Sequence, residues 1–134
     1  MQAYLGSTVA GYPNLFFLWG PNTNLAHSSV VFMAEAQLQY VVDALKTMRR
    51  QGTEAVEVRR DVQDAWNSEV QEKLTDTVWN TGGCASWYID RNGDNSIMWP
   101  GFTFSFRRMT RRFDPAAHIA LSPAGRASLE PEAV

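Results

Sequence analysis

The hydrophobic positions follow a helical period over the second fifth of the chain. Apolar residues at helical spacing are Val30, Ala34, Leu38, Val41, Val42, Leu45 and Met48. Ser28 or Ser29 can cap the start, basic residues occupy the last turn, and Gly52 ends the pattern. The sequence therefore predicts an amphipathic helix from Ser29 to about Arg50.

A second helix is predicted from Asp61, because apolar residues recur there every four positions. These residues are Val62, Trp66, Val70, Leu74 and Val78. The Gly-Gly-Cys sequence at 82–84 ends this pattern.

Three segments show the pattern of strands. "AVEVRR", residues 55–60, alternates apolar and charged positions and predicts a half-exposed strand. "ASWYIDRNGDNSIMWPG" predicts two short strands around Asn92-Gly93, a dipeptide that favours turns with positive φ. Phe102, Phe104 and Phe106 alternate with other residues, which predicts one more strand.

The stretch "YPNLFFLWGPNTNLAHSS" holds a continuous apolar run that ends at a Gly-Pro-Asn turn before the first helix. Such a run, bounded by Pro13 and Gly20, predicts a strand that is covered on both faces, as in parallel α/β sheets. A helix start beside a tight loop offers free N–H groups and partial positive charge to a phosphate, a carboxylate or an electron-rich ring such as reduced flavin. An ordinary strand-to-helix connection is the alternative, because neither GxGxxG nor GxxxxGK[ST] occurs in the chain.

Composition narrows the class of protein. The chain has 134 residues, 45% of them hydrophobic, and a formal net charge of −2, which suits one globular domain and argues against a nucleic-acid partner. A single cysteine excludes an internal disulfide, and two histidines without ligand spacing argue against a metal site. With no apolar run of membrane-spanning length, we expect a cytoplasmic protein or a piece of one. Residues 121–134 are rich in Ser, Pro, Ala and Glu and predict a disordered tail.

Two blocks of the sequence carry a resemblance to a known family. They are "AYLGSTVAGYPNLFFLWGPNTNLAHSSVVFMAEAQLQYV" and "TVWNTGGCASWYIDRNGDNSIMWPGFTFSFRRMTRRFDP". From about Ala3 to His118 the chain resembles the C-terminal part of flavin-containing Baeyer–Villiger-type monooxygenases. The resemblance implies an α/β fold in which residues 1–120 form part of a Rossmann-like FAD-binding domain. A returning strand and helix would complete its sheet, and a helix and a β-hairpin would extend it.

The resemblance also implies where cofactors would lie. The loop would pass the flavin ring, with the first helix pointing at the pyrimidine edge, and the implied FAD-contacting residues are Gly20, Pro21, Asn22, Thr23, Asn24 and Leu25. Family members commonly carry Gly-Pro-Asn-Thr-Gly-Leu-Gly-His here, and Asn24 and Ala26 replace two of those glycines. Trp87 would lie near NADP or substrate, with a core tryptophan as the alternative. No catalytic residue is assigned, since the arginine that the family uses beside the flavin peroxide has no identifiable counterpart.

The implied activity is NADPH- and O2-dependent oxygenation of a ketone or a soft heteroatom through a flavin peroxide. The dinucleotide fingerprints would have to come from an N-terminal FAD- and NADPH-binding portion or a partner chain, without which we expect no catalysis. The alternative is a catalytically inactive fragment that serves as an interaction or structural module and associates with itself or another protein through an open sheet edge.

Several other residues favour structural roles. His27 suits capping or packing more than a cofactor contact, and Cys84 lacks a partner for nucleophilic chemistry. The basic run at 107–112 could bind an anion but is typical of a solvated face, as is Glu35. We expect Trp99 in the core and assign no role to His118.

Overall fold

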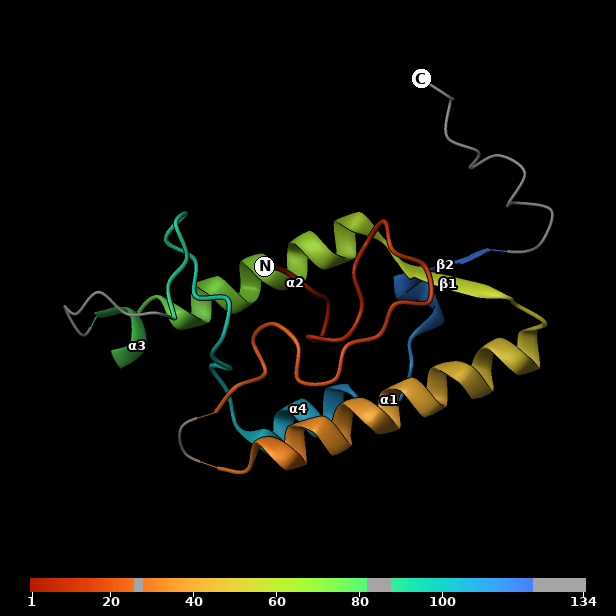
Figure 1. Cartoon of the computed structure of the whole chain (residues 1–134), viewed down its shortest axis with the longest axis horizontal. Coiled ribbons are helices and arrows are strands. Elements are labelled where there is room, and N and C mark those ends of the chain that lie inside the picture. The colour runs from red at the N-terminus through yellow and green to blue at the C-terminus, as the bar shows by residue number, and fades with distance from the viewer. Residues whose placement is uncertain (26–27, 82–87, 122–134) are drawn as a thin grey trace, which may run out of the picture.

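The computed structural model describes residues 1–25, 28–81 and 88–121. Its elements in chain order are α1 (Val30–Gln51), β1 (Ala55–Val58), α2 (Arg60–Leu74), α3 (Val78–Thr81), α4 (Thr103–Met109), the 3-10 helix η1 (Pro115–Ala117) and β2 (His118–Leu121). The long helices α1 and α2 run along the length of the molecule, and α4 lies beside α1 (Figure 1). Within the described ranges, no helix has both the length and the apolar character needed to cross a membrane.

The N-terminal segment joins the two long helices. The Gln37 side chain of α1 donates to the carbonyl of Gly6 at 2.8 Å, and the Ala10 N–H donates to the Gln63 side chain of α2 at 2.8 Å. Both glutamines are buried, so their hydrogen bonds replace those that water would otherwise make. These two amides fix the segment against the helices.

The bounds of α1 agree with the prediction from the sequence. Ser29 occupies the position before the first turn, and Gly52 ends the helix in the left-handed conformation with φ 64°. Arg49 and Arg50 occupy the last turn, where cations interact favourably with the helix dipole.

The face that α1 turns to the core differs from the predicted stripe. The buried residues are Met33, Ala36, Gln37, Tyr40, Ala44, Thr47 and Met48, so only Met48 is shared with the prediction. Leu38, Val42 and Leu45 are exposed instead. The helix carries apolar residues on two faces, and period alone does not say which of them meets the rest of the chain.

The strand predicted at 55–60 is confirmed over 55–58 as β1, and Arg60 already begins α2. β1 pairs antiparallel with β2 from Ala55 opposite Leu121 to Val58 opposite His118. It is more buried than a half-exposed strand, since only Glu57 is partly open to solvent. Leu121, the first residue of the predicted tail, belongs to β2, and the rest of that tail lies outside the described residues.

Two predicted strands are wrong. Residues 14–20 form no strand: Phe16 makes an isolated bridge with Thr8, and Asn14 and Trp19 have φ of 59° and 57°, which interrupts an extended backbone. Phe102 precedes helix α4, which contains the other two phenylalanines of the predicted strand. Phe104 is 69% exposed and Phe106 is fully buried, so alternating aromatics mark opposite sides of a helix here.

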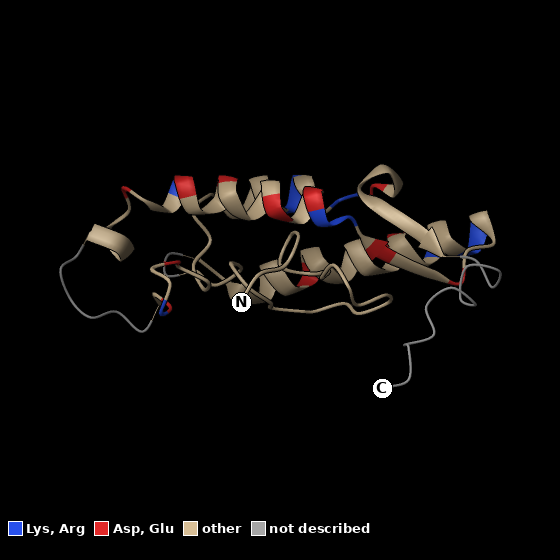
Figure 2. Ribbon diagram, turned by 90° about the horizontal axis from the view of Figure 1, so that it is seen from above, with Lys and Arg blue, Asp and Glu red and all other residues tan. Residues whose placement is uncertain are grey.

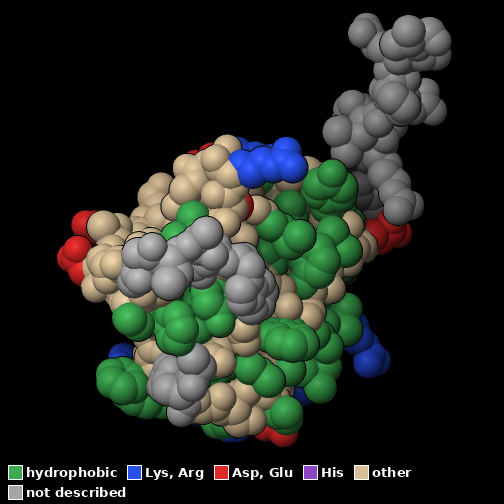
Figure 3. Space-filling model, turned by 60° about the vertical axis from the view of Figure 1, so that its left-hand side comes forward, with side chains coloured by type: hydrophobic (Ala, Val, Ile, Leu, Met, Phe, Trp, Pro, Cys, Tyr) green, Lys and Arg blue, Asp and Glu red, His purple; other side chains and the backbone are tan. Residues whose placement is uncertain are grey.

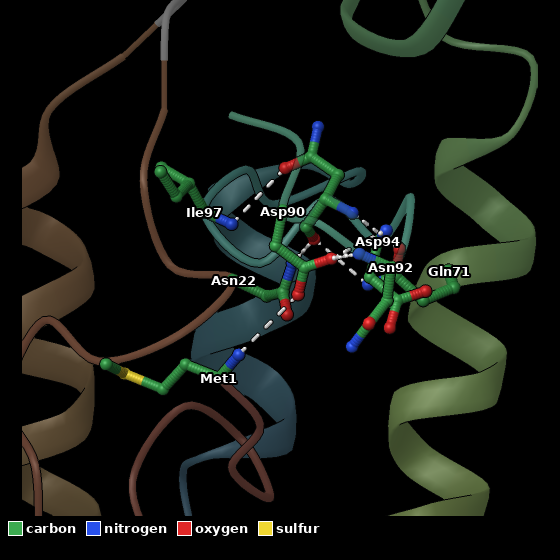
Figure 4. Close-up of polar contacts among 8 residues, drawn as sticks. Met1, Asn22, Gln71, Asp90, Asn92, Asp94 and Ile97 are labelled. Atoms are coloured by element: carbon green, nitrogen blue, oxygen red, sulfur yellow. Dashed lines mark hydrogen bonds and ion pairs between the residues drawn. The ribbon is translucent and has the colours of Figure 1, made fainter. Parts of the chain in front are cut away.

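The predicted hairpin around Asn92-Gly93 is present as a chain reversal rather than as two strands. Ile89 and Asn95 form a single antiparallel bridge, and Gly93 has the positive φ, 87°, that the turn requires. The Asp90 carboxylate accepts hydrogen bonds from the Asn92 and Asp94 N–H groups (Figure 4). A side-chain cap therefore stabilises this turn in place of a strand ladder.

The core consists of two hydrophobic clusters that share the indole of Trp66. One lies between α1, α2 and α4 and contains Leu25, Met33, Ala36, Val70, Leu74, Met98, Trp99 and Phe106. The other surrounds Tyr40 and Phe113 near the sheet. Trp66 and Trp99 stack with centroids 5.9 Å apart, and Trp99 is 6% exposed, which confirms it as a core residue.

His118 is buried in the second cluster, where sequence assigned it no role. Its Nδ1 lies 2.9 Å from the Asp114 carbonyl oxygen and its Nε2 lies 3.4 Å from the Tyr40 hydroxyl. Because a carbonyl only accepts, Nδ1 carries the proton and Nε2 is free to accept. Burial lowers the pKa of His118, and the bond to Asp114 opposes this only in part.

We expect the free energy of unfolding to fall as pH drops below the usual histidine value of 6.5. Just below that pH the histidine of the unfolded chain is protonated while His118 of the folded chain is still neutral, which stabilises the unfolded state. The free energy of unfolding stops falling once the pH is below the lowered pKa of folded His118. Chemical unfolding from about pH 8 to about pH 5 would measure the slope. His118→Asn retains an N–H donor but does not titrate, and its slope should be shallower. Equal slopes for both proteins would refute this role.

Candidate functional site

The loop that contains Gly20, Pro21 and Asn22 lies against the turn at residues 5–7. A Cβ on Gly20 would overlap the carbonyl of Gly6, and a Cβ on Gly6 would lie 2.6 Å from the carbonyl oxygen of Pro21. Gly6 also has φ +59°, which side-chain-bearing residues rarely adopt. The two backbones can approach this closely only because both positions are glycine.

The Asn22 side chain points into the protein and holds this loop to the segment that follows the 92–93 turn. Its amide donates to the carbonyls of Asn95 at 2.6 Å and Met98 at 3.1 Å, and its own N–H donates to Ser96 at 3.0 Å. Figure 4 shows Asn22 beside the 90–97 segment. Asn22 has φ 55°, a conformation that asparagine tolerates better than most residues.

Asn24 continues the pairing in the manner of a short parallel ladder. Its N–H donates to Ile97 at 3.0 Å, and its carbonyl accepts from the Trp99 N–H at 2.9 Å. Thr23 is fully buried and its hydroxyl donates to the Gly20 carbonyl at 2.6 Å. Backbone hydrogen bonds from Asn22 and Asn24 thus fix the loop to the segment at residues 96–99.

Asn95 is the centre of this hydrogen-bond network and is fully buried. Its side-chain oxygen accepts from the Ile97 and Met98 N–H groups, and its amide nitrogen donates to Asn80 at 3.1 Å. Gln71 of α2 both donates to the Asn95 carbonyl and accepts from the Asn95 N–H, each at 2.9 Å. The network therefore connects the loop to α2.

A cavity of about 520 Å³ opens beside the loop. Its lining residues are Met1, Phe17, Trp19, Gly20, Pro21, Asn24, Ser96 and Ile97. The lining is mostly apolar with a few polar groups, the composition that small-molecule and cofactor sites usually show.

Residues 26–29 connect this loop to the start of α1, and the first two of them lie outside the described ranges. Ser29 makes no side-chain capping hydrogen bond, and the first turn contains no acidic residue. The positive end of the helix dipole is consequently not neutralised by the residues of its own first turn.

The predicted FAD-contacting residues occupy three kinds of position. Gly20, Pro21 and Asn24 line the cavity, Asn22 and Thr23 are buried with their side chains bonded within the protein, and Leu25 belongs to the core at 8% exposed. The first three could touch a ligand directly, and the others position them. Their role toward a cofactor stays a prediction.

Other candidates from the sequence lie apart from the cavity or outside the described residues. Trp87, Cys84, His27 and Ala26 all fall outside the described ranges. Glu35 is exposed. In the described part of the chain, no group of three His, Cys, Asp or Glu could hold a metal ion.

The arginines of the 107–112 run are exposed, as a solvated face would be. Arg107, Arg108 and Arg111 line a second cavity of about 460 Å³ with Gln39 and Phe104. Arg107 lies over the Phe32 ring at 4.9 Å, and no ion pair involves these three within residues 1–25, 28–81 and 88–121.

Sequence patterns missed three amides that fix the loop, the buried Gln37 and Asn95 and the half-buried Gln71. A helix wheel assigns glutamine to the solvent face, and Asn95 lies in a run of turn-forming residues. The sequence signal that could have identified Gln37 is its place among Met33, Ala36, Tyr40 and Ala44 on one face.

Comparisons with known proteins place the chain beside flavin-dependent monooxygenases, although no protein-family model matches it. It is 50% identical over 131 residues to a Baeyer–Villiger monooxygenase of Pseudomonas aeruginosa, covering 96% of this chain and 25% of that protein. It is 33% identical over 111 residues to the FAD-binding monooxygenase ktnD of Aspergillus niger, covering 80% of this chain and 18% of that protein. The chain therefore spans a quarter or less of the length of these relatives.

A solved structure shows the same fold over most of the chain. Oxidized steroid monooxygenase bound to NADP superposes with a TM-score of 0.77 at 22% identity, over 90% of this chain and 23% of that one. The resemblance inferred from the two sequence blocks is thus confirmed, and the mixed helix and strand content agrees with an α/β fragment.

Proposed function

Since the chain corresponds to part of a Baeyer–Villiger-type flavin monooxygenase, we propose that it supplies one wall of the flavin site in such an enzyme. The observation that supports this most is the rigidly held loop Gly20–Asn24 beside an apolar cavity of about 520 Å³. Its place in a Rossmann-like FAD domain, and a C-terminal position in the whole enzyme, are parts of the same proposal.

The residues present fit a flat, largely apolar ring with one polar edge. Phe17, Trp19, Pro21 and Ile97 offer apolar surface, and Asn24 offers an amide. The start of α1 favours negative charge, which suits the pyrimidine edge of a reduced flavin. Phosphate binding would fall to the rest of the enzyme, because this chain contains neither dinucleotide fingerprint.

When bound and reduced by NADPH, FAD would supply the activation of dioxygen for oxygenation of a ketone or a soft heteroatom. The chain's own part is to orient the ring through the loop and exclude water with Phe17, Trp19 and Ile97. Asn22, Asn95 and Gln71 keep the loop in place, so that no reorganisation is needed when the ring binds. Trp87 near NADP or substrate remains part of the proposal.

A chimera of this chain with a relative, called the joined protein below, tests this role. This chain would replace the aligned quarter of the Pseudomonas aeruginosa relative, and FAD affinity would be followed by flavin fluorescence and absorbance. We expect stoichiometric FAD binding, and Ser96→Trp should weaken it about tenfold or more because the indole fills the cavity.

Ser68→Trp is the matched control, since Ser68 is exposed on α2 and should leave FAD affinity unchanged. Equal affinity of both variants would refute the placement of the ring in this cavity. A folded joined protein that binds no FAD would instead favour the second candidate, a catalytically inactive interaction module, which the absence of both fingerprints from this chain supports.

A further inference from the structure

Helix α1 carries a second apolar face on the side opposite to the core. Val31, Leu38, Val42 and Leu45 are 62%, 51%, 41% and 54% exposed. Their spacing of seven, four and three residues places them on one side of the helix. We call these four residues the outer face of α1.

This distribution differs from that of an ordinary surface helix, which places charged and polar residues on the face opposite to the core. The core side of α1 accommodates the polar Gln37 and Thr47, while large aliphatic residues point outward. Between Val30 and Val42 the only charged residue is Glu35. Large aliphatic residues on a second face are expected of a helix that another part of a larger protein covers.

Helix α2 provides the contrast within the same molecule. Its exposed residues include Asp61, Asp64, Ala65, Ser68, Glu69, Glu72 and Lys73. Figure 2 shows charged residues, coloured red and blue, along the length of the α2 ribbon. Over its described residues 60–74, helix α2 therefore exposes no large hydrophobic side chain, whereas α1 exposes the four of its outer face.

Exposed aromatic side chains lie near α1 as well. Trp19 is 58% exposed, and its backbone N–H donates to the Gln37 side-chain oxygen at 2.7 Å. Phe102 and Phe104 stack with centroids 5.4 Å apart at the start of α4, which packs against α1. Figure 3 views the molecule from the side where α3 lies and shows hydrophobic side chains exposed over that face as well. Apolar surface of this extent usually marks an interaction site.

We propose that the outer face of α1 docks the portion of the monooxygenase fold that lies outside the aligned quarter of the relatives. This inference rests on the proposed function. The Pseudomonas aeruginosa relative is 50% identical to this chain over 96% of its length, but the match covers only 25% of that relative. The remaining three quarters of such a protein are therefore available to cover the outer face of α1. A second copy is the weaker choice, because four half-exposed aliphatic side chains are too few for the roughly 800 Å² per partner of a stable interface. A much longer portion can cover Trp19 and Phe104 too.

The test compares the same substitutions in two settings. In the 134-residue chain alone, Leu38→Asp and Val42→Asp should leave the unfolding temperature close to that of Ala65→Asp, because all three sites are exposed. In the joined protein, Leu38→Asp and Val42→Asp should lower the yield of protease-resistant product about tenfold or more, since a carboxylate is buried at an apolar contact. Ala65→Asp, on the solvated side, should not.

The readout is taken without FAD, so docking and flavin binding are separated. Suppose that the joined protein resists protease, loses this resistance with Leu38→Asp, and binds no FAD. This result would support the docking inference and refute the proposed function. Equal yields for the Leu38, Val42 and Ala65 variants would overturn the docking inference. So would a chain that dimerises alone and becomes monomeric with Leu38→Asp, because the occupant would then be a second copy.

A mixing experiment tests docking even if the joined protein does not fold. This chain and the complementary portion of the relative would be combined, and hydrogen exchange compared between peptides from α1 and α2. Slower exchange confined to α1 supports docking. No association either in the joined protein or on mixing would overturn it.

Discussion

Replacing Phe106 by alanine is expected to lower the free energy of unfolding by about 3–5 kcal/mol. Phe106 is fully buried between α1 and α2 and meets the Trp99 ring edge-on at 5.2 Å. Its removal takes a large apolar side chain out of the core and leaves a cavity that the indole of Trp99 can fill only in part. Denaturant unfolding followed by tryptophan fluorescence would measure the change.

Phe104→Ala is the matched control two residues away. Phe104 is 69% exposed, so its loss should change the free energy of unfolding of the chain by about 0.5 kcal/mol or less. The two variants also distinguish the helix from the strand that the alternating phenylalanines predicted. Similar destabilisation by both would contradict the placement of α4.

Replacing Asn95 by alanine is expected to cost about 2–4 kcal/mol of stability and to release the loop. The substitution removes the acceptor of the Ile97 and Met98 N–H groups and the donor to Asn80. The Met98 N–H lies in the core and would have no water to replace the lost acceptor. Denaturant unfolding gives the energy, and hydrogen exchange at residues 20–25 reports the loop.

Asn92→Ala serves as the control in the same turn region. Asn92 is exposed, and its recorded hydrogen bond to Asp90 uses the backbone N–H, which alanine retains. We expect a change of about 0.5 kcal/mol or less and unaltered exchange in the loop. If Asn95→Ala behaved like Asn92→Ala, the loop would be held by something other than this network.

How much the sequence predicts differs between elements for physical reasons. The bounds of α1 follow from a glycine in the left-handed region and basic residues in the last turn, all of which act within a few residues. The alternation of residues 55–60 predicts β1 as a strand but not its burial, because the Ala55 and Val56 side chains are both buried. The apolar run at 14–20 predicts a strand, yet a strand needs a neighbour, and the part of the chain described here offers Phe16 only an isolated bridge with Thr8.

The candidate site divides in the same way. Gly20, Pro21 and Asn24 could be singled out from their order before a helix, and they do line the cavity. The residues that hold them could not be found, because Asn95 and Gln71 lie 73 and 49 positions beyond Asn22 and nothing local distinguishes a buried amide from a solvated one.

By itself the sequence determined α1, the start of α2, the 55–58 strand and the turn at Asn92-Gly93, because capping and turn chemistry act locally. The predicted continuation of the second helix through Val78 is wrong, since α2 ends at Leu74 and Val78 begins the separate helix α3. The sequence also carried the resemblance to Baeyer–Villiger-type monooxygenases through two long blocks of residues. Only the tertiary structure decided which face of α1 is buried and that Phe106 lies on a helix. Both depend on which distant segments are present to cover an apolar surface, and the period of a pattern does not record that.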